Sequence, residues 1–248
     1  MSIDAPNAFK LLEYTCTSGE MTACAIVGGH YLEGTEHLQI AADVPRALAL
    51  LHKACDHGDS LGCWYLADEA LSERGGGDRE KGRTLYSRAC AGNDENAKES
   101  CAKLAELLDR GAFGPRDAQA AFAAYKRACE RGHDKVCVRY GGMLALGDGV
   151  QKDAATARTI LAEPCRREIP FPFRSDNCRV LGDMLRDGVG GPKDITGAIE
   201  VYELLCPNDP PRSSSGLATL TATNSKDSEA CTALARLRPS PPKNRARR

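Results

Sequence analysis

The chain of 248 residues is poor in aromatic side chains, carries almost no net charge and contains no long apolar run. Phe, Trp and Tyr make up 5% of the residues, and Trp64 is the one tryptophan. The formal net charge is −1, whereas surfaces that bind nucleic acid normally carry a basic excess, so we expect no nucleic-acid partner. No stretch approaches the roughly 18 apolar residues that a transmembrane helix needs, so we expect no membrane span.

Short motifs for export, metal binding and catalysis are also missing. The first twenty residues include Asp4 and Glu13 and no uninterrupted apolar stretch, so they do not resemble a signal peptide. No two cysteines are closer than eight residues, which excludes the C-x-x-C redox motif and the close cysteine pairs typical of zinc sites. The five histidines form no H-E-x-x-H motif, and no G-x-S-x-G motif is present. We therefore expect neither a metal nor a cofactor.

What the sequence does contain is a repeat marked by twelve cysteines. Taken two by two, the first members recur every 35 to 41 residues. An aspartate lies twelve residues before each first cysteine, and small residues lie eight before it and four after the second cysteine. The aspartates are Asp4, Asp43, Asp78, Asp117, Asp153 and Asp194. This fixed frame indicates a tandem array of six repeats.

Each repeat is predicted to form two helices. The aspartate is a typical N-cap, and apolar residues such as Ala121, Ala124 and Tyr125 then recur at helical spacing. Gly58 and Gly132, three residues after a first cysteine, suit the position just beyond a helix end. A unit of this length cannot bury its own apolar stripe, so neighbours must stack. We predict an all-α fold, an α-solenoid (α/α superhelix) of six helix-turn-helix repeats.

The array is predicted to form one solenoid domain over residues 1–238, with repeats at about 4–42, 43–77, 78–116, 117–152, 153–193 and 194–238. The last repeat contains a long irregular insert at 207–228, and the fifth has a remodelled turn at 169–173. Residues 239–248 are predicted to be a basic, Pro-rich tail.

Disulfides and metal ligation compete as explanations of the cysteines. One cluster, His52, Cys55, His57 and Cys63, has metal-ligating residue types, but the other repeats lack both histidines. The first cysteine ends one helix and the second opens the next, beside the turn where Cα atoms approach the 4.4–6.8 Å of a bridge. We therefore predict disulfides within the pairs, which are Cys16 with Cys24, Cys55 with Cys63, Cys90 with Cys101, Cys129 with Cys137, Cys165 with Cys178, and Cys206 with Cys231.

Disulfides of this kind imply an oxidising, extracytoplasmic compartment. We expect the periplasm or secretion to the exterior, with the mitochondrial intermembrane space as the alternative. Because Asp4 already belongs to the first repeat, we expect either that an export signal is absent from this chain or that export follows another route.

Beyond this frame, a family is recognisable. The pattern Asp117…Ala121-x3-Tyr125-x2-Ala128-Cys129-x7-Cys137-x3-Gly141-x5-Gly147-Asp148-Gly149-Val150-x2-Asp153 resembles Sel-one-like repeats, relatives of the tetratricopeptide repeat. With a cysteine pair in each repeat, residues of about 4–238 are similar to the Helicobacter cysteine-rich proteins, which are secreted, disulfide-bridged solenoids. A second resemblance is to the mitochondrial cytochrome c oxidase assembly factor built from the same cysteine-paired repeats.

The first resemblance implies penicillin binding or weak β-lactamase activity as one function. Ser100 and Lys103 match the S-x-x-K element of serine β-lactamases, and residues 175–177 match S-D-N, but K-T-G is absent. Ser100 and Ser175 are two repeats apart, on the order of 20 Å or more for stacked helices. A nucleophile and its base must lie about 3 Å apart, so an enzyme is disfavoured.

The hypothesis that remains is a non-enzymatic, monomeric scaffold that binds a protein or peptide along a concave face formed by the first helices. Residues seven and three before each first cysteine share a helical stripe there. An alternative is that the apolar members merely pack between repeats. The candidate binding residues are Phe9, His52, Arg83, Phe122, Lys126 and Arg158. The other functions left open are a binder or weak hydrolase of β-lactams or cell-wall precursors, and an assembly factor for a mitochondrial redox complex.

Overall fold

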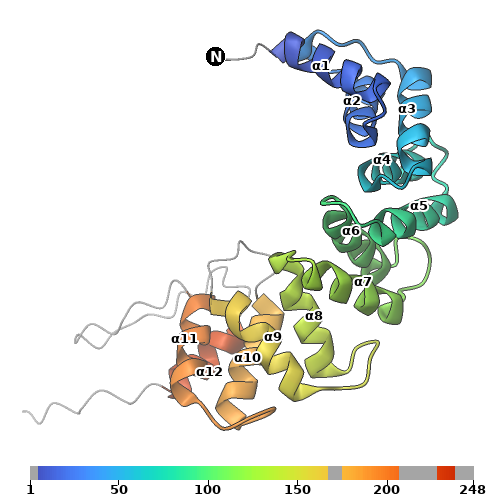
Figure 1. Cartoon of the computed structure of the whole chain (residues 1–248). Coiled ribbons are helices and arrows are strands. Elements are labelled where there is room, and N and C mark those ends of the chain that lie inside the picture. The colour runs from blue at the N-terminus through green and yellow to red at the C-terminus, as the bar shows by residue number, and fades with distance from the viewer. Residues whose placement is uncertain (1–4, 167–174, 207–227, 238–248) are drawn as a thin grey trace, which may run out of the picture. The chain divides into compact units, whose positions relative to one another are not determined.

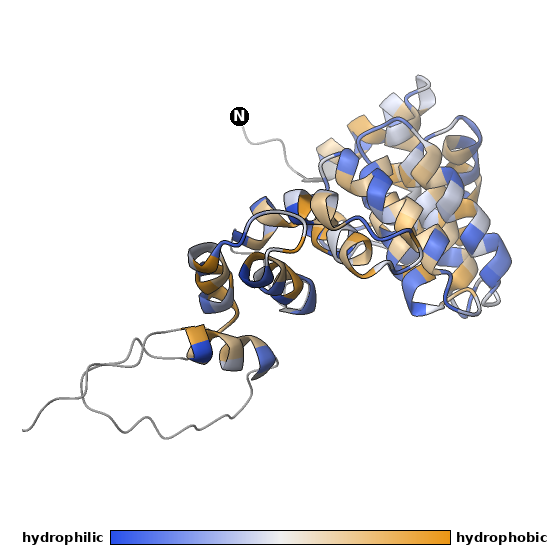
Figure 2. Cartoon of the chain, turned by 90° about the horizontal axis from the view of Figure 1, so that it is seen from below, coloured by the Kyte–Doolittle hydropathy of each residue, from blue (hydrophilic) through white to orange (hydrophobic). Residues whose placement is uncertain are grey.

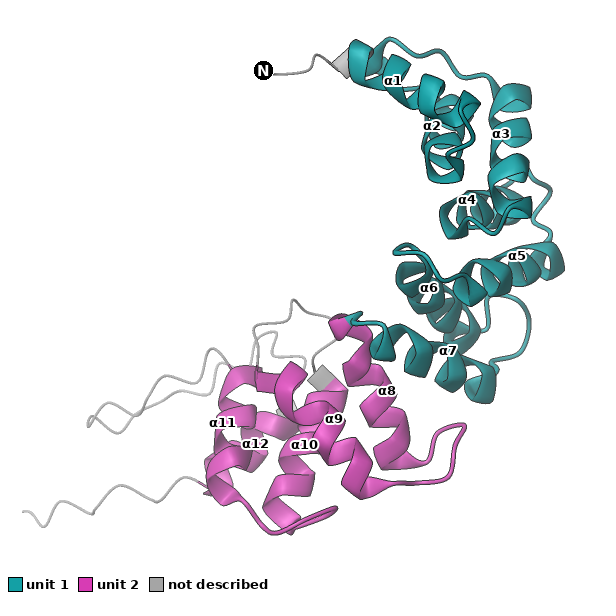
Figure 3. Ribbon diagram, in the orientation of Figure 1, with its two compact units in different colours: residues 1–133 teal, residues 134–248 magenta. Residues whose placement is uncertain are grey.

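The computed structural model describes residues 5–166, 175–206 and 228–237, which fall into two compact units, residues 1–133 and 134–248 (Figure 1, Figure 3). The predicted all-α fold is confirmed, because the described elements are helices with one isolated β-bridge between Thr35 and Ile40. The predictions for Asp4, for the turn at 169–173 and for the tail at 239–248 lie outside the described residues, as does the insert up to residue 227. The single domain over 1–238 stays a prediction.

Odd-numbered helices are the first helices of the repeats, and even-numbered helices are the second. Unit 1 contains α1 (Ala5–Thr17), α2 (Met21–Glu33), the 3-10 turn η1 (Glu36–Leu38), α3 (Val44–Asp56), α4 (Ser60–Leu71), α5 (Arg79–Ala91), α6 (Ala97–Arg110) and α7 (Ala118–Glu130). Unit 2 contains α8 (Asp134–Leu146), α9 (Ala154–Arg166), α10 (Ser175–Asp187), α11 (Ile195–Leu205) and α12 (Ser228–Leu237).

Among the described residues, the repeated aspartate begins each first helix from α3 onward, as predicted. From α3 onward its carboxylate accepts a hydrogen bond from the backbone N–H three residues later, at 2.8–3.1 Å, which satisfies a donor that the helix leaves unpaired. The five caps are Asp43, Asp78, Asp117, Asp153 and Asp194.

Glycines end the first helices where the chain must turn sharply into the second. Gly58 and Gly132, which follow α3 and α7, have φ angles of +86° and +84°. This left-handed conformation is costly for a residue with a Cβ atom, so glycine at this position of the frame permits the short turn.

The largest packing surface joins a second helix to the first helix of the following repeat. α2 packs more extensively on α3 than on α1, and α4 more extensively on α5 than on α3. A small residue makes the close approach possible: a Cβ atom on Gly28 of α2 would lie only 2.8 Å from the fully buried Leu51 side chain of α3. Figure 2 shows hydrophobic and hydrophilic residues interspersed along the helices.

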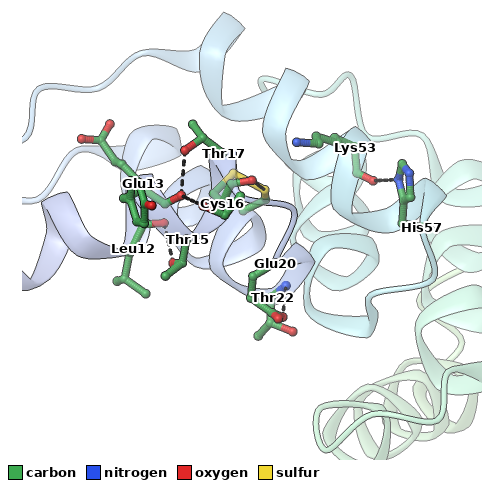
Figure 4. Close-up of a disulfide and its surroundings, with 12 residues drawn as sticks. Leu12, Glu13, Thr15, Cys16, Thr17, Glu20, Thr22, Lys53 and His57 are labelled. Atoms are coloured by element: carbon green, nitrogen blue, oxygen red, sulfur yellow. Dashed lines mark hydrogen bonds between the residues drawn. A yellow bond between two sulfur atoms is a disulfide. The ribbon is translucent and has the colours of Figure 1, made fainter.

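Disulfides join the two helices of a hairpin beside their turn. The pairs Cys16–Cys24, Cys55–Cys63 and Cys90–Cys101 have Cα–Cα distances of 4.4–4.6 Å. The bridges Cys165–Cys178 and Cys206–Cys231 span 5.4 and 5.6 Å, and Cys129 and Cys137 are also disulfide-bonded. Figure 4 shows the first bridge, which holds the end of α1 against α2 next to the turn that contains Glu20.

Within unit 1 the second helices lie on the inside of the curve that the helices follow (Figure 1). α2 packs against α4, and α4 against α6, whereas no comparable contact joins α1 to α3, α3 to α5 or α5 to α7. The inner layer of a curved stack is compressed and the outer layer is spread. The expectation that the first helices form the concave face is therefore wrong for unit 1.

An ion pair between buried Glu69 and half-exposed Arg74 fixes the loop between α4 and α5. The Glu69 carboxylate is nearly buried and accepts two hydrogen bonds of 2.7 Å from the Arg74 guanidinium, in a bidentate arrangement. Hydrogen bonding to Arg74 lowers the pKa of Glu69 below its ordinary value of 4.5, with burial acting in the opposite direction. The charged form of Glu69 thus stabilises this loop.

Removing one disulfide is expected to destabilise the chain without changing its fold. The double substitution Cys55→Ala and Cys63→Ala should lower the free energy of unfolding by about 2.5 kcal/mol, because closing a short loop limits the unfolded chain. Urea unfolding followed by circular dichroism measures the change. An unaltered unfolding midpoint would contradict a stabilising role for this bridge.

The Glu69–Arg74 pair predicts a pH-dependent stability difference. Glu69→Gln should cost about 1.5–3 kcal/mol at pH 7, the range for hydrogen bonds to charged groups. Since the pKa is lowered in the folded state, this contribution is present above pH 4.5 and is lost as the pH falls below it. Unfolding midpoints at pH 7 and pH 3 test this, with exposed Glu200→Gln on α11 as the control. A difference as large at pH 3 as at pH 7 would contradict a stabilising role for the charged form of Glu69.

Candidate functional site

The structure does not gather the six candidate binding residues into one site. Phe9 is part of the core, with 7% of its surface exposed, and its ring makes edge-on contacts with the rings of His30 and Tyr31. Its selection as a surface residue is wrong, because at α1 this position of the frame faces α2. Phe122 of α7 is half-buried.

The remaining four candidates belong to four different helices, and Arg158 is the one whose side chain is partly buried. His52 is exposed on α3, and Lys126 is exposed on α7, where its Nζ is 3.8 Å from a Glu130 oxygen. Arg158 belongs to α9 in unit 2, where a Cβ atom on Gly191 would lie 3.1 Å from its Nη1. Arg83 is exposed on α5 and lines a groove.

We call this groove the α5 groove. It has a volume of about 870 Å³ and lies on the exposed side of α5. The residues that line it are Arg79, Glu80, Arg83, Thr84, Ser87, Arg88, Ala91 and Phe113. It therefore offers three guanidinium groups, one carboxylate, two hydroxyls and one aromatic ring on a single helix and the loop that follows α6.

Salt bridges to the neighbouring first helices hold two of these arginines. Arg83 Nη2 is 2.9 Å from an oxygen of Asp117, the cap of α7. Arg88 Nη2 donates to the Cys55 carbonyl at 3.2 Å and lies 3.3 Å from Asp56, at the end of α3. A hydrogen bond from the Ala120 backbone, with a further one from Arg83, lowers the pKa of Asp117. Both pairs are largely exposed, so a competing anion can reach these guanidinium groups.

Sequence reasoning found Arg83 and the stripe residue Ser87 but missed the other lining residues. Arg79 was detectable, because it precedes Arg83 by four residues and so shares its helix face. Phe113 was not, because its counterparts in the loops of later repeats, Gly149 and Gly190, have no side chain. In the structure its ring centroid is 6.5 Å from that of buried Tyr86, which anchors it at the edge of the groove.

The cluster at His52, Cys55, His57 and Cys63 does not offer a set of metal ligands. Both cysteines are oxidised in one bridge, and His57 Nδ1 is 2.7 Å from the Lys53 carbonyl oxygen (Figure 4). Across the residues that the structure describes, no group of three or more His, Cys, Asp or Glu side chains gathers as metal ligands would. In the same residues no helix has the length and hydrophobicity to cross a membrane.

The serine of the S-x-x-K element is not available as a nucleophile. Ser100 lies in the first turns of α6 with no exposed surface, and its Oγ donates a 3.1 Å hydrogen bond to the Asn96 carbonyl. Ser175 is the first residue of α10, in the other unit. The arrangement in α6 is that of a satisfied core serine.

Comparison with known families gives a match to the Sel1 repeat. The family model matches residues 22–59, 60–94, 98–133, 135–159 and 178–206, which together exceed half of the chain. Each complete match joins a second helix to the following first helix, the pair with the most extensive packing.

Two curated relatives carry names that state a role. Cytochrome c oxidase assembly factor 7 of Xenopus tropicalis is 28% identical over 162 residues, which cover 62% of this chain and 68% of that protein. Cytochrome c oxidase assembly factor 7A of Xenopus laevis matches with the same identity and coverage.

Solved structures show the same fold. A protective antigen present in uropathogenic Escherichia coli strains, with an SLR fold, superposes with a TM-score of 0.64 at 22% identity, over 81% of this chain and 41% of the antigen. A Sel1 repeat protein from Oxalobacter formigenes gives a TM-score of 0.63 at 19% identity, over 81% of this chain and 78% of that protein. This chain thus spans less than half of the antigen's length, and the α-solenoid fold predicted from the sequence is confirmed.

Proposed function

The chain belongs to the Sel1 repeat family, and on this premise we propose that it is a non-enzymatic scaffold that binds an extended segment of another protein in the α5 groove. The observation that carries the proposal is the groove itself, a 870 Å³ depression with three arginines and an aromatic ring on a rigid helix. Arginine and aromatic residues are enriched in protein interfaces, where they supply most of the binding energy.

The chemistry of the groove favours binding over catalysis. Its lining residues include no histidine or cysteine, and Glu80 is its one carboxylate. The guanidinium groups suit carboxylates of a bound segment, and Thr84 and Ser87 can exchange hydrogen bonds with its backbone. The occupant that fits is an acidic stretch of polypeptide with an apolar side chain against Phe113.

The disulfides support an oxidising compartment for this scaffold. Within that class we favour the periplasm or the exterior, as the resemblance to secreted cysteine-rich solenoids implies. Alkylation of the native protein without reduction should label no cysteine, because all twelve are oxidised.

A second candidate function rests on the curated relatives. Both are cytochrome c oxidase assembly factors, and 62% of this chain aligns with them. On this alternative the scaffold would bind a subunit of a redox complex during assembly, in the mitochondrial intermembrane space. Copurification with a haem- or copper-containing complex would favour it over a periplasmic or secreted scaffold.

Charge reversal in the groove should weaken partner binding, while the same change beside the groove should not. Arg79→Glu, in the first turn of α5, is expected to reduce recovery of the partner in cross-linking from the native compartment about tenfold. Lys81→Glu is the matched control, because it changes the net charge equally in the same turn but does not line the groove. Equal recovery by the two variants would refute the α5 groove as the binding site.

The buried Ser100 predicts no serine β-lactamase activity through this residue. Ser100→Ala should leave any hydrolysis of the chromogenic cephalosporin nitrocefin unchanged, since the hydroxyl donates to the backbone inside the core. Turnover that is present in the wild type and abolished in Ser100→Ala, with circular dichroism unchanged, would revive the hydrolase alternative.

A further inference from the structure

The first helix exposes a face that every later first helix buries. In α3, α5, α7, α9 and α11, the residues eight and four before the first cysteine are buried. The four-before residues are Leu51, Tyr86, Tyr125, Leu161 and Tyr202, and none is more than 6% exposed. Their counterparts in α1, Ala8 and Leu12, are only half-buried.

Two large apolar side chains of α1 lie in solvent, Leu11 on this face and Tyr14 beside it. Leu11 is 55% exposed and Tyr14 is 68% exposed, one helical turn apart. In α5 and α11 the counterparts of Leu11 are Leu85 and Val201, which are 6% and 0% exposed. Exposed apolar residues that cluster on one helix face mark a surface for a partner.

In the later repeats the same type of element covers this face of the first helix. It is the preceding second helix, whose small residue sits against the bulky side chain of the first helix. A Cβ atom on Gly28, Gly141 or Gly182 would come within 2.4–2.8 Å of Leu51, Leu161 or Tyr202. α6 uses buried Ala105 in the equivalent place, between buried Leu104 and Leu108. These interfaces indicate which kind of helix surface would fit α1, because Ala8 and Leu12 of α1 occupy the same positions of the repeat as the buried residues of the later first helices.

In two later repeats, the residue at the position of Tyr14 makes a hydrogen bond to the preceding repeat. Its counterparts Arg88 and Arg127 each donate a 3.2 Å hydrogen bond to a carbonyl at the end of the preceding first helix, from Cys55 and Ala91 respectively. The Tyr14 hydroxyl is likewise a donor on a long side chain. In the later repeats this position contacts the preceding first helix, so Tyr14 borders the face and is not part of it.

We propose that the face formed by Ala8, Leu11 and Leu12, bordered by Tyr14, is a docking site for an amphipathic helix of a partner protein. That helix stacks on α1 as α2 stacks on α3, with Gly or Ala against Leu12 and leucines one turn to either side. The repeated interface between second and first helices thereby continues beyond α1. This is helix recognition by an apolar surface, at a site separate from the α5 groove.

A synthetic helix tests the site directly. The probe is a fluorescein-labelled peptide of residues 97–110, the α6 sequence, with Cys101→Ser. Fluorescence anisotropy with the full chain should show saturable binding. Leu11→Glu should weaken it at least tenfold, and so should Ala105→Arg in the peptide. Leu146→Glu in the chain is the matched control, because Leu146 is 61% exposed on α8 and should leave binding unchanged.

Each contrary result overturns the proposal. Circular dichroism of Leu11→Glu should match the wild type, since exposed positions tolerate substitution. Absence of binding by the wild-type chain, or equal binding by Leu11→Glu, would show that α1 is not a docking site. In sedimentation experiments the chain alone should be monomeric. If it self-associates and Leu11→Glu abolishes the association, the face binds a second copy of this chain and the proposal is wrong.

Discussion

The close contact between a second helix and the following first helix is the interaction on which the array depends. A residue without a bulky side chain on one helix admits a large, fully buried side chain on the next, as Gly28 admits Leu51 and Gly182 admits Tyr202. These contacts are apolar and continuous from repeat to repeat within each unit. Packing at this density tolerates no added atoms, which explains why the small residues recur at one position of the frame.

The disulfides act on the other contact, the one within a hairpin. α1 and α2, or α3 and α4, share less packing surface than α2 and α3 share, and the bridge lies where they are joined. In the frame of the family match, Cys55 belongs to residues 22–59 and Cys63 to residues 60–94. The bridge therefore connects one matched repeat to the next, and the weaker of the two alternating contacts is the one that is covalently fixed. A chain with few aromatic residues gains rigidity in this way.

Local features of the fold could be predicted from the sequence because each has a cause within a few residues. The caps Asp43 and Asp78, the turn at Gly58 and the cysteine pairs beside the turns all follow from the frame. The direction of curvature in unit 1 could not, because it depends on the relative spacing of two helix layers. Phe9 and Arg83 occupy the same frame position, yet one lies in the core and the other lines a groove. Their burial differs because different residues surround them in space, and a repeat pattern does not contain that information.

Because these bridges each join the two helices of a single hairpin, their cysteines do not depend on a distant part of the chain for a partner. Duplication or loss of a whole repeat during evolution would thus leave an even number of thiols and no orphan. Oxidative maturation could proceed hairpin by hairpin as the polypeptide emerges, without waiting for its far end. The array can therefore change in length, and with it the extent of its surface, while its redox chemistry stays the same.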